Sequence, residues 1–238
     1  PRAHLLSNGR YSVMVTAAGS GYSRWQDIAV TRWREDVTRD HWGSYIFLRD
    51  VHSGEVWSAG YQPSGTEADQ YEAIFSEGRA EIIRHDGTIA TTLEVAISSE
   101  VDAEVRRVSI TNLGNQAREV ELTSYPELAL APKPADDAHP AFSKLFVETE
   151  FVADVGAILA TRRQRSPSDT QAWAAHLAVV EGDTVGERQF ETDRARFLGR
   201  GRGIRTPVAV TDGSPLWGRA GTVVDPIFSL RYRVRVAP

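Results

Sequence analysis

The chain has 238 residues, 41% of them hydrophobic, with a formal net charge of -5 and an isoelectric point near 5.7. This length can bury a substantial core, while the acidic balance argues against a nucleic-acid partner. There are no cysteines, which excludes disulfides and thiolate metal sites.

No apolar run approaches the roughly 18 to 20 residues that a membrane span needs, and no signal peptide is visible. We therefore expect no direct membrane insertion by this segment and a cytoplasmic location, which the absence of cysteine also fits. Because the chain begins at Pro1 and not at Met, we expect it to be an excised fragment or a processed product of a larger enzyme.

Residues 7–36 combine a strand-like alternation, a run of five small residues (17–21) and a dense set of aromatic and arginine side chains. One interpretation is a rigid loop in which Tyr22, Arg24 and Trp25 present an aromatic face and planar donors to a polar ring-shaped ligand. The alternative is a glycine-relieved crossing between two sheets, with Trp25 and Trp33 in the core. Composition alone favours the alternative, since buried aromatic residues usually serve packing.

Short alternating segments bounded by turn residues predict strands along most of the chain. The predicted strands cover residues 44–50, 55–58, 71–75, 79–85, 88–97, 104–111, 117–125, 145–152, 157–163, 172–180 and 230–236. The Asp86-Gly87 dipeptide predicts a tight turn, and Thr192-Asp193 predicts the cap of one helical turn that extends to Phe197.

Residues 126–140 break this pattern, because they contain four prolines and no usable period. A loop of this length in a compact domain is either disordered or functional. No segment has a convincing amphipathic helix of 12 or more residues. The sequence therefore predicts an all-β fold, a large antiparallel sandwich with minimal helix, which forms one domain over residues 1–238.

A catalytic site is hard to assemble from these residues. The six histidines form no His-x-x-x-His or His-x-His pair, and the chain has no Gly-x-Ser-x-Gly elbow. His176 is interpreted as a half-buried strand residue and not as a metal ligand. The basic glycine-rich segment 199–203 lacks the context of a phosphate-binding loop. Carboxylates that could pair for acid–base chemistry are too abundant for any to be specific: Glu35, Asp36, Asp136 and Asp137. We expect no catalytic residue, no metal and no cofactor.

Several long motifs carry a family resemblance. NGRYSVMVTAAGSGYSRWQDIAVTRWRED (8–36), YIFLRDVHSGEVWS (45–58) and YEAIFSEGRAEI (71–82) resemble the N-terminal β-sandwich domain of glycoside hydrolase family 94, which contains inverting β-glucoside phosphorylases. DDAHPAFSKLFVETE (136–150) and DPIFSLRYRVRV (225–236) are most similar to the sandwich of cyclic β-1,2-glucan synthases within that family. The resemblance covers essentially the whole chain and implies a supersandwich like that of galactose mutarotase.

The resemblance also implies a role. In this family the sandwich precedes an (α/α)6 barrel, which holds the catalytic acid and the phosphate-binding groups. Residues 1–238 are therefore expected to form a non-catalytic accessory domain that supplies loops to the sugar site. The implied partners are a β-glucan or gluco-oligosaccharide, the barrel of the same chain and, in a homodimer, a second subunit. Anchoring of the parent enzyme in the bacterial inner membrane is left open.

Two positions are carried over from the family. Trp25, in Gly-Tyr-Ser-Arg-Trp, matches an aromatic residue that borders the sugar site, and Ser143-Lys144 lies where the family has Gln-Arg. Ser-Lys lacks the planar bidentate donors of Gln-Arg, so the hydrogen bonds are expected to differ. We expect Trp25 and residues 135–146 to lie together at one end of the sandwich, facing the barrel, with Tyr22 and Arg24 beside Trp25.

Two other functions remain open. Six tryptophans and seven tyrosines support a self-sufficient carbohydrate-binding module. A mutarotase-like sugar epimerase is the weaker alternative, because that chemistry uses a His/Glu pair and no such pair can be nominated from the sequence.

Overall fold

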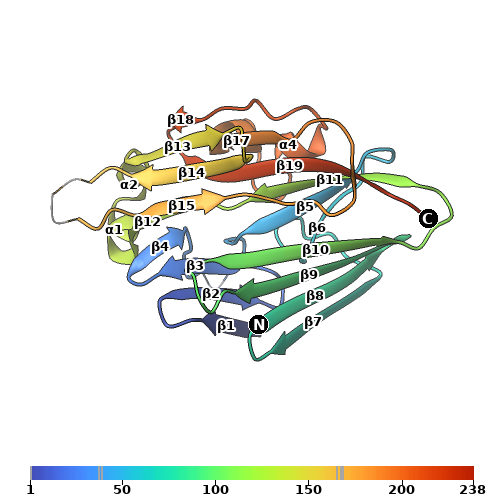
Figure 1. Ribbon diagram of the computed structural model, residues 1–238, viewed down its shortest axis with the longest axis horizontal. Helices are drawn as coiled ribbons and strands as arrows, with labels where there is room; N and C mark the ends of the chain where they lie inside the picture. Colours follow the sequence, from blue (N-terminus) through green and yellow to red (C-terminus); the bar gives the residue numbers. More distant parts are fainter. Residues whose placement is uncertain (1, 37, 39, 165, 167–168) are drawn as a thin grey trace.

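The computed structural model describes residues 2–36, 38, 40–164, 166 and 169–238. About 48% of the chain is strand and 9% is helix, and the strands form four antiparallel sheets stacked into layers (Figure 1). The predicted all-β antiparallel supersandwich with little helix is therefore confirmed.

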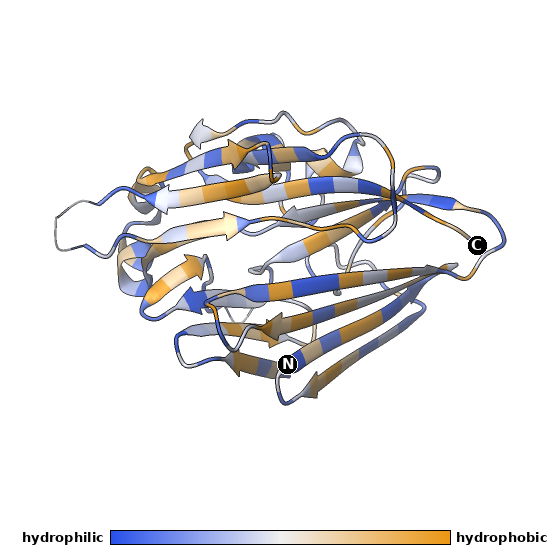
Figure 2. Ribbon diagram, in the orientation of Figure 1, coloured by the Kyte–Doolittle hydropathy of each residue, from blue (hydrophilic) through white to orange (hydrophobic). Residues whose placement is uncertain are grey.

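The first two sheets pack together in the lower half of Figure 1. Sheet 1 has the order β1 (Ala3–Ser7), β2 (Tyr11–Thr16), β3 (Gly21–Trp25), β4 (Ile28–Thr31) and β12 (Leu128–Pro132). Sheet 2 is a meander of β10 (Glu104–Asn112), β9 (Ile89–Ile97), β8 (Arg79–Asp86) and β7 (Gln70–Ser76). Alternation of hydrophobic and polar residues is visible along these strands in Figure 2, and it buries one face of each sheet against the other.

The other two sheets form the upper half of the same view. Sheet 3 has the order β16 (Asp183–Thr184), β19 (Pro226–Val236), β11 (Arg118–Tyr125), β5 (Tyr45–Asp50) and β6 (Val56–Ser58), and β17 (Gln189–Asp193) also pairs with β19. Sheet 4 has the order β15 (Trp173–His176), β14 (Ala157–Arg162), β13 (Val147–Val152) and β18 (Gly221–Thr222). The helices are α1 (Lys133–Ala138), α2 (Pro140–Lys144), α3 (Arg194–Leu198) and α4 (Val208–Thr211).

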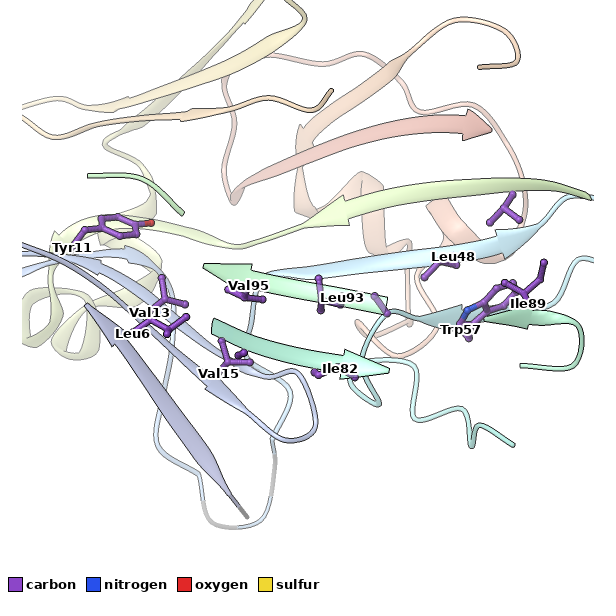
Figure 3. Packing of buried hydrophobic residues seen from close by; sticks show 13 residues of the cluster. Leu6, Tyr11, Val13, Val15, Leu48, Trp57, Ile82, Ile89, Leu93 and Val95 are labelled. Carbon is purple, nitrogen blue, oxygen red and sulfur yellow. The ribbon is translucent and has the colours of Figure 1, made fainter. Parts of the chain in front are cut away.

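Three clusters of buried apolar side chains hold the layers together. The first, where sheet 2 packs against sheets 1 and 3, includes Val13, Ile82 and Leu48 (Figure 3). The second lies between sheet 3 and the short helices and includes Phe47 and Phe197, and the third joins β12 to sheet 4 and β19. Burying an apolar side chain of this size contributes about 1.5–3 kcal/mol, so the three clusters are the main stabilising element of the fold.

Residues 126–140 are more ordered than the sequence predicted. Instead of an irregular loop they contain β12, α1 and the start of α2. Four consecutive residues of β12, 128–131, are buried, so its sequence cannot show the alternation by which the other strands were recognised. The two helices are too short to display a 3.6-residue period.

Residues 17–25 also differ from both interpretations of the sequence. Residues 17–20 close a hairpin between β2 and β3, which are neighbours in sheet 1, and residues 21–25 form β3. This segment is therefore neither a projecting loop nor a crossing between sheets. At Gly21, where φ is 150°, a Cβ would lie 1.8 Å from the carbonyl oxygen of Met14. The glycine thus permits close packing within the sheet.

Two smaller predictions had different outcomes. The strand predicted over 172–180 is shorter, because β15 ends at His176. The helical turn after Thr192-Asp193 is confirmed: the Asp193 side chain accepts a hydrogen bond from the backbone N–H of Ala195 at 2.9 Å and caps α3. No helix in the described part of the chain has the length and hydropathy that spanning a bilayer requires.

Candidate functional site

The helices α1 and α2 lie at one end of the molecule, here called the α1–α2 end, beside β4 and β12 (Figure 1). α1 and α2 follow β12 directly in the chain, and β12 pairs with β4. This pairing brings residues 28–32 and 128–144 together, although they are about a hundred positions apart in the sequence.

Trp25 ends β3 and is half-buried. Its indole Nε1 donates a hydrogen bond to Asp102 Oδ2 at 2.8 Å, and the Asp102 carboxylate also accepts a bond from Arg10 Nε at 2.9 Å. The indole packs against the first and the third of the apolar clusters described above. Its polar atom is therefore engaged within the chain, and only part of its ring surface is available to a ligand.

Tyr22 and Arg24 occupy the opposite face of β3 from Trp25, because successive strand residues point to alternate sides. The Tyr22 ring contacts Trp33 edge-on, with 5.5 Å between centroids. Arg24 is exposed, and its Nε donates to the carbonyl oxygen of Gln26 at 2.6 Å. The aromatic and arginine motif is thus divided between two faces of the sheet and does not form one platform.

Ser143 and Lys144 end α2. Ser143 is only 3% exposed, and its backbone and side-chain oxygens accept bonds from Arg162 Nη1 at 2.8 and 3.3 Å. Lys144 Nζ lies 2.7 Å from Asp225 Oδ2, in the segment that precedes β19. Ser143 therefore holds α2 in place, while Lys144 is the more accessible member of the pair.

Lys144 belongs to a group of six charged side chains, which we call the charge cluster: Arg32, Glu127, Asp136, Lys144, Arg194 and Asp225. Arg32 makes a bidentate pair with Asp136, with N–O distances of 2.9 and 2.8 Å. Arg194 Nε lies 2.6 Å from Glu127 Oε1. The three cations balance the three anions, which is what allows so many charges to be buried together.

The pairing determines the ionisation of these groups. Burial alone would raise the pKa of the Asp136 carboxyl, but the hydrogen bond and charge of Arg32 outweigh it and hold this pKa below its ordinary value. Burial likewise opposes the charged form of Arg194, yet the neighbouring Tyr125, Glu127 and Asp225 raise its pKa. Asp136 and Arg194 are therefore charged at neutral pH.

One fully buried donor and one fully buried acceptor of the charge cluster lack a hydrogen bond. Among the described residues, Arg32 Nη1 and Asp225 Oδ1 have no hydrogen-bond partner, and they lie 3.6 Å apart. That separation is longer than a hydrogen bond but compatible with an ion pair.

Sequence reasoning did not find three members of the charge cluster, namely Glu127, Arg194 and Asp225. A signal was present for two of them, because Glu127 and Asp225 each adjoin a proline and lie among apolar residues. A charge in such surroundings is usually paired when buried. The partners could not be read from the sequence, since they are distant in the chain.

The structure offers little for catalysis elsewhere. In the part of the chain that is described, no group of three or more His, Asp or Glu residues could hold a metal ion. His176 lies in β15, stacked on Phe228, with Nε2 2.7 Å from Ser124 Oγ. Burial lowers the pKa of His176 to about 4, so its ring is neutral at pH 7. Its interpretation as a partly buried strand residue is confirmed.

The sequence of the chain matches a known protein family and several known enzymes. The family description "Glycosyl hydrolase 94, supersandwich domain" matches residues 1–238. The chain is 43% identical over 232 residues to the cyclic beta-(1,2)-glucan synthase NdvB of Rhizobium meliloti (strain 1021), which covers 98% of this chain and 8% of that protein. It is 26% identical over 222 residues to an N,N'-diacetylchitobiose phosphorylase of Vibrio furnissii, covering 90% of this chain and 26% of the relative.

A solabiose phosphorylase of Paenibacillus borealis is 25% identical over 173 residues, which covers 71% of this chain and 21% of the relative. The chain thus spans well under a third of the length of each of these three relatives.

Proposed function

The chain belongs to the glycosyl hydrolase 94 supersandwich family, and on that premise we propose that it is a non-catalytic accessory domain of a β-glucan-active enzyme. The 43% identity to a cyclic β-1,2-glucan synthase over 98% of the chain favours a synthase of that kind over a phosphorylase. Residues 1–238 then form one domain of a longer protein, whose barrel would carry out the chemistry.

The observation that carries this proposal is the charge cluster. A general acid or base must be free to exchange a proton with a substrate at the working pH. At the α1–α2 end, Asp136, Glu127 and Asp225 are each paired with a cation. Such carboxylates are suited to holding backbone and side chains in place, which is the contribution expected of an accessory domain.

We propose that this end contacts the sugar through Lys144 and the uncovered part of Trp25, with Ser143 as a positioning residue. Lys144 carries three ammonium donors, and one carboxylate partner leaves capacity for a sugar hydroxyl. Tyr22 and Arg24, on the other face of β3, are proposed to contact a different part of the glucan or the neighbouring barrel. A second subunit is the alternative partner for that face.

A self-sufficient carbohydrate-binding module is the second candidate function. It is favoured by two tryptophans that are largely exposed, Trp173 at 59% and Trp217 at 74%. Indole rings left in solvent are typical of sugar-binding surfaces, where they supply an apolar face with a polar edge.

Calorimetric titration of the 238-residue chain with β-linked gluco-oligosaccharides, combined with an assay for glucose 1-phosphate release, tests the proposal. We expect no turnover and no micromolar affinity, because the accessory role requires the barrel for both. Micromolar binding without turnover would favour the module. Phosphorolysis or hydrolysis of a β-glucan, or epimerisation of a sugar, would contradict a non-catalytic role.

A further inference from the structure

A pocket lies beside α3 and α4. It has a volume of about 320 Å³ and is lined by α3, α4, Glu191 of β17 and residues 214–217. None of its lining residues belongs to the charge cluster, and none is Tyr22, Arg24, Trp25 or Ser143. Its size lies at the lower end of the range for small-molecule sites, which fits a ligand of one ring.

The carboxyl group of Glu191 gives this pocket its chemistry. The side chain is 1% exposed. Its Oε1 accepts hydrogen bonds from the backbone N–H groups of Thr192 and Asp193 at 2.9 and 2.8 Å. Its Oε2 has no hydrogen-bond partner among the described residues, and neither does Oγ of Ser229, its cross-strand neighbour. Buried polar atoms normally have partners, so a carboxylate oxygen left without one points to a group that the chain itself does not supply.

Trp217 lines the pocket, and 74% of its surface is exposed. The guanidinium of Arg196 lies over its ring, 4.9 Å from the centroid, which holds the indole in place by a cation–π contact. The remaining lining is mainly apolar, from residues such as Phe197 and Leu216. A buried carboxyl, a guanidinium and an indole therefore surround one apolar hollow.

We infer that this pocket binds a single hexose ring of a glucan, with Glu191 Oε2 accepting a bond from a ring hydroxyl and Trp217 packing against the ring. A hexose has apolar C–H faces and a polar rim of hydroxyls, which matches this combination of groups. A metal cation fits less well, because the Arg196 guanidinium and the apolar lining oppose it. The choice of a glucosyl ligand rests on the proposed function.

Titration of the 238-residue chain with D-glucose and with a β-1,2-linked glucose disaccharide, followed by amide and indole NMR shifts, tests the inference. We expect saturable millimolar shifts at the Trp217 indole N–H and at the amides of Ala195 and Leu216. Trp217→Ala should weaken binding about tenfold, equivalent to about 1.4 kcal/mol. Glu191→Gln should weaken it as well, because the amide oxygen can replace Oε1 toward the backbone while an N–H donor takes the place of Oε2.

Leu5→Ala is the control, since Leu5 is also an exposed apolar side chain, at 59%, but lies on β1 of sheet 1, and it should leave the shifts unchanged. Wild-type affinity in Trp217→Ala, or sugar-induced shifts confined to Trp25 and Lys144, would overturn the inference while leaving the proposed function intact. Shifts at the pocket with none at the α1–α2 end would support the inference and agree with the proposed function, in which Lys144 and Trp25 contact the sugar only when the barrel is present. If Glu191→Gln does not fold, the exposed Trp217 still decides the outcome.

Discussion

Arg32 has a side chain that is only 1% exposed, and it lies within ion-pair distance of Asp136, Glu127 and Asp225. Removing a buried cation leaves its carboxylate partners without compensation, which costs far more than losing an ion pair in solvent. At the scale of single residues, the stability of the α1–α2 end therefore depends on Arg32 more than on any surface charge.

We predict that Arg32→Met lowers the free energy of unfolding by about 3–5 kcal/mol, the range found when one partner of a buried pair is removed. Arg79→Ala is the control, because Arg79 is 52% exposed and pairs with Glu94 at the surface, and its loss should cost no more than about 1 kcal/mol. Urea denaturation measures both values. Equal losses in the two variants would mean that the charge cluster is not a stabilising unit.

His176 gives the chain a pH dependence with a defined sign. Its pKa is about 4 in the folded chain, against an ordinary 6.5, because burial opposes the charged ring. Between these values the unfolded chain binds a proton that the folded chain does not. Stability is therefore lost as the pH falls from about 6.5 to about 4, with a slope of up to about 1.4 kcal/mol per pH unit.

We predict that His176→Gln flattens the dependence of unfolding free energy on pH between 4 and 6.5, compared with the wild type. His52→Gln, at an exposed turn, is the control variant and should follow the wild-type curve. Urea denaturation at a series of pH values gives the slopes. A wild-type slope in His176→Gln would show that this histidine does not titrate differently on folding.

At the scale of elements, the sequence predicted those strands that have one buried and one exposed face. In β9, Ile89, Thr91, Leu93 and Val95 are buried while the residues between them are not, so the alternation is visible in the sequence. In β12 the four residues 128–131 are all buried, and such a strand carries no alternation. The small residues 17–21 were interpreted as part of either a rigid loop or a crossing between two sheets, whereas residues 17–20 close the tight hairpin that precedes β3.

Gly21 provides a test of that hairpin. We predict that Gly21→Ala destabilises the chain by clearly more than Gly9→Ala, measured as free energy of unfolding in urea. Both glycines have positive φ, 150° and 90°, so both variants are strained by about 1–3 kcal/mol. Only at Gly21 would the new Cβ also meet backbone, at 1.8 Å from the oxygen of Met14, while Gly9 has nothing within 4 Å. Similar losses of unfolding free energy in the two variants would mean that the β2–β3 backbone moves to accommodate the new Cβ.

At the scale of the whole molecule, the layers determine which distant residues meet. The charge cluster unites residues from the segment that follows β4, from α1, α2 and α3, and from the segments that precede β12 and β19. No local pattern encodes such a set, which is why Asp136 was noticed only as one of several carboxylates and not as the partner of Arg32. Lys144 was nominated as a sugar-binding residue from the family resemblance. Its ion pair with Asp225 became visible only in the folded chain.

The same arrangement yields a prediction for the complete enzyme that carries this chain. Lys144→Ala should weaken the use of a sugar acceptor by roughly tenfold, because a charged hydrogen bond contributes about 1.5–3 kcal/mol before ordering costs and about 1.4 kcal/mol corresponds to a factor of ten. Folding should be retained, since Asp225 also lies within 3.4 Å of Arg194 and 3.6 Å of Arg32. Trp25→Ala should have a similar effect on acceptor use, with Trp25→Phe retaining part of the packing.

Lys133→Ala is the matched control for that experiment. Lys133 begins α1 in the same region, but it is more exposed and pairs with Asp137 one helical turn later, so the accessory role assigns it no contact with sugar. Steady-state kinetics at varied acceptor concentration would separate the two lysines, with the Michaelis constant rising in Lys144→Ala and unchanged in Lys133→Ala. If Lys144→Ala and Trp25→Ala both keep wild-type kinetics, the α1–α2 end does not contact the acceptor, and its charge cluster serves only to hold the sandwich together.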